Sequence, residues 1–522
     1  MVFIIPFVLP IFLLLLVLVA GANRRQIRRK NLPPSPPALP FFGHLYLLKK
    51  PLHHPLAALS AAYGPIVSLR FGSRPVLLVS SASAADECFS KNDLAFANRP
   101  RFLAGKHLGY DYTTLVWASY GPRWRDLRRI TAAEVFSVAR LDSFSAVVFE
   151  EVAAMVKSVA KDSRSSGADG LVELRPRLFD LTLNLMMRMI SGKRFSSEGS
   201  GEGKRFREIV RETFEVSGAT NLADFLPLLR WFDYKGVEKQ LVMLQGKRDA
   251  FFKEVVESRR KQYDLRSPLM DARSEGGEEE KDSVKPRKCL IDVLLSLQTA
   301  DPKLFTDEFI KGVVVVLLSS GTETSALTME WALALLLTNP TALAKARAEL
   351  DSCVGGGRLL NDSDLCNLPY LHYVIRETLR LKPVAAMIPA HESGEDCTVG
   401  GYTVKQGTTL LVNAWAINRD PGTWPEPEVF RPERWKEEGG GGKKSGKTLM
   451  FGMGRRACPG EGMAMRVVAM ALGALLQSFE WDVDGGGVDL SEGPGLSMPM
   501  ATPLRASCRR REFGEEDDIL FA

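Results

Sequence analysis

The chain has 522 residues, of which 45% are hydrophobic and 25% are charged, an ordinary composition for a globular protein with a large buried core. The net charge of +6 is small and dispersed, so nucleic acid is not an expected partner, and the absence of a repeat of about 20–50 residues argues against a solenoid. The seven cysteines are scattered and form no Cys-x-x-Cys pair, which argues against a disulfide framework or a zinc site and fits a reducing compartment.

Residues 1–23 are predicted to form a membrane anchor. No charged residue occurs at positions 2–22, and about 20 apolar residues are enough to cross a bilayer as a helix. A signal peptide cleaved near Ala22 is the alternative, but no basic residue precedes the apolar run. A basic cluster at 24–30 follows it, which predicts an uncleaved anchor with the rest of the chain in the cytosol.

Residues 24–49 are predicted to be a basic and proline-rich linker that acts as a stiff spacer. Residues 50–522 are predicted to form one large body, mainly α with minor β. It is expected to begin with a hairpin of strands at 66–71 and 76–79 and to be mostly helical from there to about 380, with a loop at 264–288 and a long helix at 306–337. Strands are expected again at 398–404 and 408–412. A low-complexity segment at 437–447 and a solvated acidic tail at 515–518 follow.

The long predicted helix carries a glycine among hydroxyl and acidic residues, at positions 320–325. This composition is locally unfavourable in a buried helix. Gly321 removes a side chain where something must approach closely, and the Thr324 hydroxyl can divert backbone hydrogen bonds and bend the helix. In isolation, a threonine that bonds back to its own helix is the simpler interpretation.

Glu377 and Arg380 lie three positions apart on one face of a predicted helix. An exposed ion pair of this kind contributes little to stability. Arg434 follows later in a Pro-Glu-Arg-Trp run, upstream of the cysteine loop described next.

The run ending at Gly460 reads Phe-x-x-Gly-x-Arg-x-Cys-x-Gly and precedes an apolar helix pattern. Gly454 and Gly460 allow turns and a close approach of the backbone to a flat partner. Arg455, Arg456 and the N-terminus of the following helix are expected to favour a thiolate at Cys458. A thiolate on a glycine-lined loop is suited to a soft metal centre, and haem iron is a large, flat one.

Together these motifs resemble those of the cytochrome P450 family of haem-thiolate monooxygenases, over nearly the whole chain. The resemblance implies the helix-rich cytochrome P450 fold behind one transmembrane helix, with the Cys458 thiolate on the iron of haem b. Glu323 and Thr324 would be the acid and the alcohol of oxygen activation, and Glu377 and Arg380 would close a buried network with Arg434. The other implied haem contacts are Trp124, Arg128, His391 and Arg456 at the propionates, and Phe451, Gly454 and Gly460 in the cysteine loop.

The chain is most similar to plant microsomal members of the family, in the subgroup that includes isoflavone hydroxylases. The likeness rests on segments 391–402, 411–417 and 492–496. It implies substrate contacts from segments 102–120, 214–225, 313–320, 384–388 and 496–497. Ser320 stands where the family usually has Ala or Gly, and Met450 replaces a usual proline.

The implied activity is insertion of one oxygen atom of O2 into a lipophilic small molecule, either a phenolic, isoflavonoid or other plant specialised metabolite or a xenobiotic. Electrons would come from NADPH through cytochrome P450 reductase, docked on a basic face that includes Arg123, Arg125, Arg129 and Arg455. The implied location is the endoplasmic reticulum membrane, with a single-pass anchor and a cytosolic catalytic body. A reductase-independent, peroxide-rearranging haem isomerase and a non-catalytic membrane haem-binding protein are the alternatives, and the preserved chemical motifs argue against both.

Overall fold

The computed structural model describes residues 31–167, 170–195, 201–217, 221–275, 288–437, 449–483 and 487–511. The predicted anchor at 1–23 and the predicted acidic tail lie outside the described residues, as does nearly all of the low-complexity segment at 437–447. The described part of the proline-rich linker lies against the body, since the Pro34 carbonyl accepts a hydrogen bond from Ser68 N at 2.8 Å and the Arg70 N–H donates to His44 Nδ1 at 2.8 Å.

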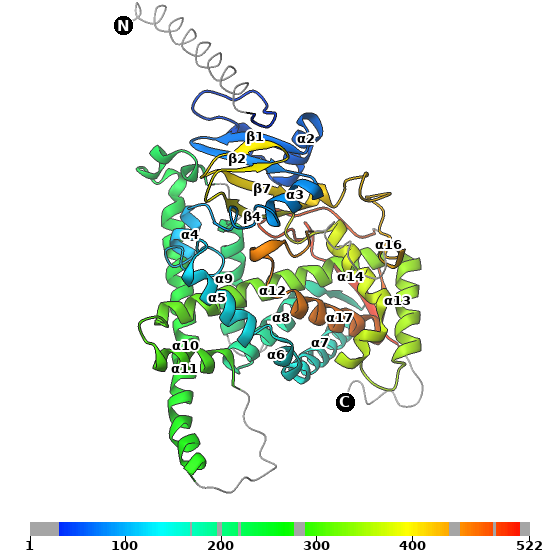
Figure 1. Ribbon diagram of the computed structural model, residues 1–522. Coiled ribbons are helices and arrows are strands. Elements are labelled where there is room, and N and C mark those ends of the chain that lie inside the picture. The colour runs from blue at the N-terminus through cyan, green and yellow to red at the C-terminus, as the bar shows by residue number, and fades with distance from the viewer. Residues whose placement is uncertain are drawn as a thin grey trace, which may run out of the picture.

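Helices make up most of the described chain and lie below a small sheet in Figure 1. In the first half of the chain they are α2 (His53–Tyr63), α3 (Ala82–Phe89), α4 (Leu103–Leu108), α5 (Pro122–Glu134), α6 (Val138–Ser143), α7 (Ser145–Ser165), α8 (Leu174–Ser191), α9 (Gly201–Ser217) and α10 (Val237–Glu275). In the second half they are α11 (Leu290–Ala300), α12 (Asp307–Leu337), α13 (Pro340–Cys353), α14 (Pro369–Leu381), α15 (Ala414–Ile417), α16 (Arg434–Glu437) and α17 (Glu461–Ser478).

The described strands form three small sheets. Their bounds are β1 (Ile66–Phe71), β2 (Arg74–Val79), β3 (Leu171–Glu173), β4 (Met387–Glu392), β5 (Cys397–Val399), β6 (Tyr402–Val404), β7 (Thr409–Asn413), β8 (Phe479–Asp482) and β9 (Arg505–Arg510). The largest sheet has the order β1-β2-β7-β4, with β2 and β7 parallel and the other pairs antiparallel. The sequence predicted the β1–β2 hairpin, and this fold is mainly α with minor β as expected.

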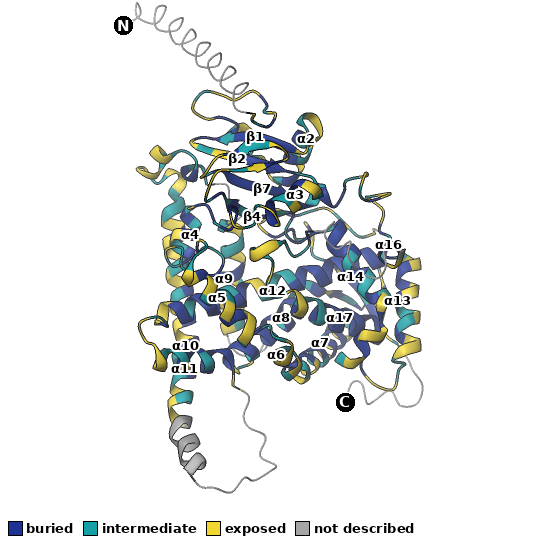
Figure 2. Cartoon of the chain, in the orientation of Figure 1, coloured by how far each residue is buried: buried dark blue, intermediate teal, exposed yellow. Residues whose placement is uncertain are grey.

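The long helix α12 crosses the centre of the molecule and packs against α8, α14 and α17 (Figure 1). It begins at its predicted position because the Thr306 hydroxyl accepts a hydrogen bond from Phe309 N at 3.2 Å and caps the first turn. Figure 2 shows this interior in dark blue. Among the described helices, α12 alone is long and apolar enough to cross a membrane, and most of it is buried in the core.

Two predicted elements differ from the structure. The predicted loop at 264–288 is helical in its first part, because α10 continues to Glu275. A polar, charged sequence without an apolar period lacks a core-facing stripe, but it contains good helix formers that extend a helix already nucleated. The predicted strand at 398–404 is a hairpin, since Gly400 and Gly401 adopt positive φ and turn the chain between β5 and β6.

Candidate active site

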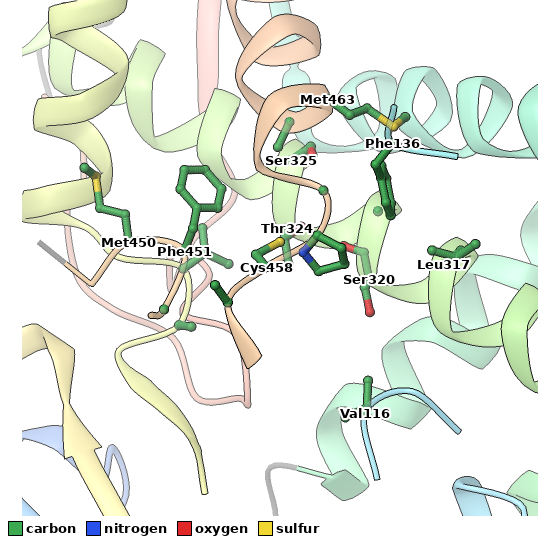
Figure 3. Close-up of a pocket in the computed structure, with 18 of the residues that line it drawn as sticks. Val116, Phe136, Leu317, Ser320, Thr324, Ser325, Met450, Phe451, Cys458 and Met463 are labelled. Atoms are coloured by element: carbon green, nitrogen blue, oxygen red, sulfur yellow. Dashed lines mark hydrogen bonds between the residues drawn. The ribbon is translucent and has the colours of Figure 1, made fainter. Parts of the chain in front are cut away.

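A cavity of about 340 Å³ lies between α12 and the cysteine loop, the segment 449–460 that precedes α17. Side chains from both elements line it: Leu317, Ser320 and Thr324 from α12, and Phe451 and Cys458 from the loop. Figure 3 shows these side chains around a common space, with Phe136 and Met463 at one side. The structure therefore brings together the two motifs that lie more than a hundred residues apart in the sequence.

The cysteine loop is shaped by its glycines. Gly454 has a φ of +68°, and a Cβ there would collide with the Asp93 carboxylate and the Phe89 carbonyl. The Cys458 N–H donates to the Phe451 carbonyl at 2.8 Å, which closes the loop on itself. A Cβ on Gly460 would lie 3.9 Å from Cys458 Sγ, so glycine keeps the space beside the sulfur open. Gly454 shapes the loop from behind and does not line the cavity.

The Cys458 side chain is open to the cavity, but the pKa of its thiol is raised. Burial is the largest cause, and the Glu461 carboxylate raises the pKa further, whereas the Gly460 N–H and the Arg128 guanidinium lower it. Burial therefore outweighs the Arg128 guanidinium and the Gly460 N–H at the start of α17, both of which act in the expected direction, toward a thiolate. Coordination to a metal would supply the missing stabilisation, because it deprotonates a thiol outright.

Three buried or half-buried guanidinium groups stand at the edge of the cavity, and we call Arg99, Arg128 and Arg456 the arginine rim. Arg128 donates to the Ala457 carbonyl at 2.8 Å, and Arg456 donates to the Ala97 carbonyl at 2.6 Å and stacks 4.8 Å from the centroid of the Trp124 ring. Arg99 is 9% exposed and donates to the carbonyls of Pro389 and Ala390.

The arginine rim has no carboxylate partner among the described residues; its hydrogen bonds go to main-chain carbonyls. Burial and, second to it, a neighbouring rim arginine lower the pKa of Arg99 to about 9 and that of Arg456 to about 10. Buried cations without counter-charges are costly. The residues therefore fit a flat ligand that carries two carboxylates, as haem does with its propionates.

His391 and Trp124 also line the cavity, and their contact with the propionates stays a prediction. The His391 Nδ1–H donates to the Phe96 carbonyl at 2.7 Å, and burial and the nearby rim arginines hold the pKa of the imidazole well below its usual range. The Trp124 Nε1–H donates to the Leu115 carbonyl at 3.2 Å. Arg99 was missed by the sequence analysis, because an arginine before a proline carries no motif that would single it out.

The α12 side of the cavity carries hydroxyl groups. The Thr324 hydroxyl donates to the Ser320 carbonyl at 2.7 Å, the backbone bond foreseen for an isolated threonine. The Ser320 side chain is exposed to the cavity (Figure 3). A Cβ on Gly321 would lie 2.7 Å from Met186 Sδ, so this glycine lets α8 pack closely against α12.

Glu323 does not line the cavity, in contrast to Thr324. Its carboxyl turns toward the C-terminal segment, where Oε1 accepts a hydrogen bond from the Ser497 hydroxyl at 2.7 Å. Burial raises the pKa of Glu323 to about 7. Ser497 was expected to contact substrate, and the structure gives it this different partner.

The network predicted around Glu377 is assembled in the structure. Glu377 is fully buried, and both of its oxygens accept from Arg380, at 2.9 and 3.0 Å. Arg434 Nε donates to Oε1 at 2.9 Å and Trp435 Nε1 donates to Oε2 at 3.0 Å. We call these four residues the Glu377 cluster.

Several of the segments predicted to contact substrate line the cavity. They contribute Leu115, Val116, Val316, Leu317, Ser320, Val384, Ala385 and Ile388. Segments 214–225 and 496–497 contribute no lining residue. The wall is therefore mostly apolar, and the polar side chains that α12 adds to it are the hydroxyls of Ser320, Thr324, Ser325 and Thr328.

Comparisons with known proteins agree with this arrangement. A family model described as Cytochrome P450 matches residues 33–504. The chain is 47% identical to "Cytochrome P450 81Q32" of Catharanthus roseus, with 93% of each chain covered, and 43% identical to "Isoflavone 2'-hydroxylase" of Glycyrrhiza echinata, with 96% of each covered. A solved zebra fish cytochrome P450 with progesterone superposes with a TM-score of 0.72 at 25% identity, covering 89% of this chain and 100% of that one.

The fold, the cavity between α12 and the cysteine loop, and the matched relatives point to the same family. Its members are haem-thiolate monooxygenases, and the plant relatives include isoflavone hydroxylases. This chain belongs to the cytochrome P450 family.

Proposed function

We propose that this chain uses haem held by Cys458 to insert one oxygen atom of O2 into a lipophilic plant metabolite of the phenolic or isoflavonoid class. The observation that carries the proposal is the cavity itself: Cys458 and Thr324 line it from opposite elements, and the arginine rim stands at its edge without carboxylate partners. Bound haem supplies the oxygen-activating chemistry.

The protein residues divide the remaining tasks. Arg99, Arg128 and Arg456, with His391 and Trp124, hold the cofactor's carboxylates. Thr324 presents its hydroxyl to the cavity, and Glu323 relays protons from its half-buried position. The apolar wall holds the substrate and excludes water.

The substrate class is proposed from the cavity wall and from the relatives. A mostly apolar pocket selects a lipophilic molecule by shape. The exposed Ser320 hydroxyl offers one hydrogen bond to an oxygen-bearing ring. The 43% identical relative is named an isoflavone 2'-hydroxylase, which supports a phenolic or isoflavonoid substrate here.

We propose further that residues 1–23 anchor the enzyme in the endoplasmic reticulum membrane, with residues 50–522 in the cytosol. NADPH-derived electrons would arrive from cytochrome P450 reductase at exposed arginines beside the cysteine loop. Arg125 and Arg129 on α5 are exposed, and Arg455 is about half exposed beside Asp93, at 3.2 Å. Opposite charge on a partner would steer docking in a salt-dependent way.

The test is an assay of microsomes that contain this chain, reductase and NADPH, against a panel of phenolic and isoflavonoid compounds. We expect NADPH-dependent oxygenated products and the thiolate signature in the reduced, carbon-monoxide-bound spectrum. Cys458→Ser should abolish that signature, whereas Cys366→Ser, which changes an exposed cysteine, should retain it. A wild-type spectrum without the thiolate signature, or product formation without NADPH, would overturn the proposal.

A further inference from the structure

The C-terminal segment at 487–504 places a serine hydroxyl on the Glu323 carboxyl. Ser497 is 5% exposed, and its hydroxyl donates to Glu323 Oε1 at 2.7 Å. Glu323 Oε2 is buried and has no hydrogen-bond partner among the described residues. One oxygen of this carboxyl is therefore held by a hydrogen bond, and the other is buried without a partner among the described residues.

Ser497 is held in place by its neighbours in the chain. Met498 N donates to the Val384 carbonyl at 2.9 Å, and the Trp331 Nε1–H donates to the Met498 carbonyl at 2.8 Å. A Cβ on Gly495 would lie 2.7 Å from the Ser497 carbonyl oxygen, so the turn before Ser497 is tight. The hydroxyl thus sits on a segment fixed to α12 and to the cavity wall.

A cluster around Glu492 holds the start of this segment. Glu492 Oε2 accepts from His53 at 2.8 Å and from His54 at 3.1 Å, and Oε1 accepts from Lys382 at 3.1 Å. Two imidazoles and a carboxylate could suggest a metal site, but Lys382 and Arg419 bring positive charge to the same carboxylate and would repel a divalent cation. The cluster is better described as a clamp between α2 and the C-terminal segment.

Few charged groups act on the Glu323 carboxyl. The pKa of Glu323 is raised to about 7, chiefly by burial; the Ser497 hydroxyl and Arg175 on α8 lower it, and Glu215 on α9 raises it. Arg175 is engaged elsewhere, since its Nε lies 2.8 Å from Glu330 Oε2. Ser497 is therefore the group in direct contact that favours the ionised form.

We infer that Ser497 is a positioning residue that holds the Glu323 carboxyl on the flank of α12, with Oε1 fixed and Oε2 free to release and take up a proton. The inference rests on the proposed function, in which Glu323 relays protons during oxygenation. Glu323 gives a proton toward the cavity and regains one from solvent, while the Ser497 hydroxyl keeps its own.

The direct test is an infrared titration of the Glu323 carboxylic acid band in the holoenzyme, with the band assigned by its loss in Glu323→Gln. We expect a midpoint near pH 7 in the wild type, as the environment of Glu323 indicates. Ser497→Ala should raise the midpoint by roughly one to two pH units, the size expected for losing a hydrogen bond to a charged group. Ser497→Thr keeps a hydroxyl, so its midpoint should lie close to that of the wild type.

The functional readout is the fraction of NADPH electrons recovered in product rather than in peroxide. Glu323 stops being a proton donor when it ionises at high pH, so the fraction of electrons recovered in product should fall at alkaline pH. In Ser497→Ala this fall should occur at higher pH, together with the midpoint of the carboxyl titration. Ser491→Ala, an exposed serine on the same segment, is the matched control and should change neither readout. If Ser497→Ala titrates and couples as the wild type does, the inference is wrong; if the wild type shows no NADPH-dependent turnover, the proposed function fails instead.

Discussion

The Glu377 cluster and the arginine rim both take arginines out of water, but they differ in where the opposing charge comes from. In the Glu377 cluster, one fully buried carboxylate accepts hydrogen bonds from Arg380, Arg434 and Trp435. In the rim, the described chain offers Arg99, Arg128 and Arg456 only carbonyl oxygens. Arginines that the chain neutralises itself stabilise the fold, whereas arginines left without a counter-charge indicate a ligand that brings it.

The cost of an unpaired buried cation explains why this difference is informative. A buried cation loses its hydration, and hydrogen bonds to neutral carbonyls offset only part of that free energy. A protein therefore keeps such a cation where an opposite charge offsets the rest. Burial lowers the pKa values of the rim arginines, to about 9 for Arg99 and about 10 for Arg456. A dianionic cofactor would reverse this cost at the moment it binds, which couples haem binding to the stability of the site.

The largest expected effect comes from removing the charge of Glu377. Glu377→Gln leaves the Arg380 and Arg434 guanidinium groups buried without a full counter-charge, and breaking a buried pair costs about 3–5 kcal/mol. Urea unfolding followed by circular dichroism measures the loss. Glu254→Gln is the matched control, since the Arg205–Glu254 pair is exposed at 44% and 60% and should contribute less than about 1 kcal/mol. Equal losses in the two variants would contradict the structural role of the Glu377 cluster.

The next effect concerns the rim. If Arg456 binds a haem carboxylate as proposed, Arg456→Gln removes a charge-assisted hydrogen bond worth about 1.5–3 kcal/mol, so haem should dissociate about tenfold faster or more. Transfer of haem to an excess of apomyoglobin measures the rate. Arg455→Gln changes the adjacent, half-exposed arginine, which pairs with Asp93, and should leave the rate nearly unchanged. If Arg455→Gln releases haem as fast as Arg456→Gln, the rim has no special role.

The smallest effect is the pH dependence contributed by His391. The folded haem-free chain holds the pKa of His391 well below 6.5, so acidification protonates the unfolded chain first. The contribution of neutral His391 to the free energy of unfolding is therefore complete above about pH 6.5. At lower pH it decreases, by at most about 1.4 kcal/mol per pH unit. Urea unfolding from pH 7.5 to 5.0 should show a shallower fall in His391→Asn. Identical pH profiles for the two proteins would show that His391 titrates normally.

The sequence predicted those parts of the site that lie within short motifs. Cys458 and its glycines, the Thr324 region and the Glu377–Arg380 spacing each occur within a few neighbouring residues, where backbone geometry and periodicity fix their relation. The structure confirms that Cys458 and Thr324 share one cavity and that Arg434 reaches Glu377. The strands of the first hairpin and the start of α12 were predicted for the same reason.

Other parts depend on contacts between distant segments. Arg99 donates to the carbonyl of Ala390, 291 positions away in the sequence. Ser497 and Glu323 are hydrogen-bonded although 174 positions separate them, and His53 and Glu492 although 439 do. No local pattern marks such partners. The raised pKa of the Cys458 thiol belongs to the same class, since burial outweighs the Arg128 guanidinium and the Gly460 N–H, which favour the thiolate.

By itself the sequence indicated the mainly α architecture, because periodicity acts through neighbouring residues, and the resemblance of its short motifs to those of a known family indicated the family and the role of the cysteine loop. The tertiary structure alone decided which arginines keep a counter-charge, where the Glu323 carboxyl points and which serine holds it. Those outcomes depend on burial and on contacts made across the whole chain, and desolvation gives a charged group an energy that no local sequence records.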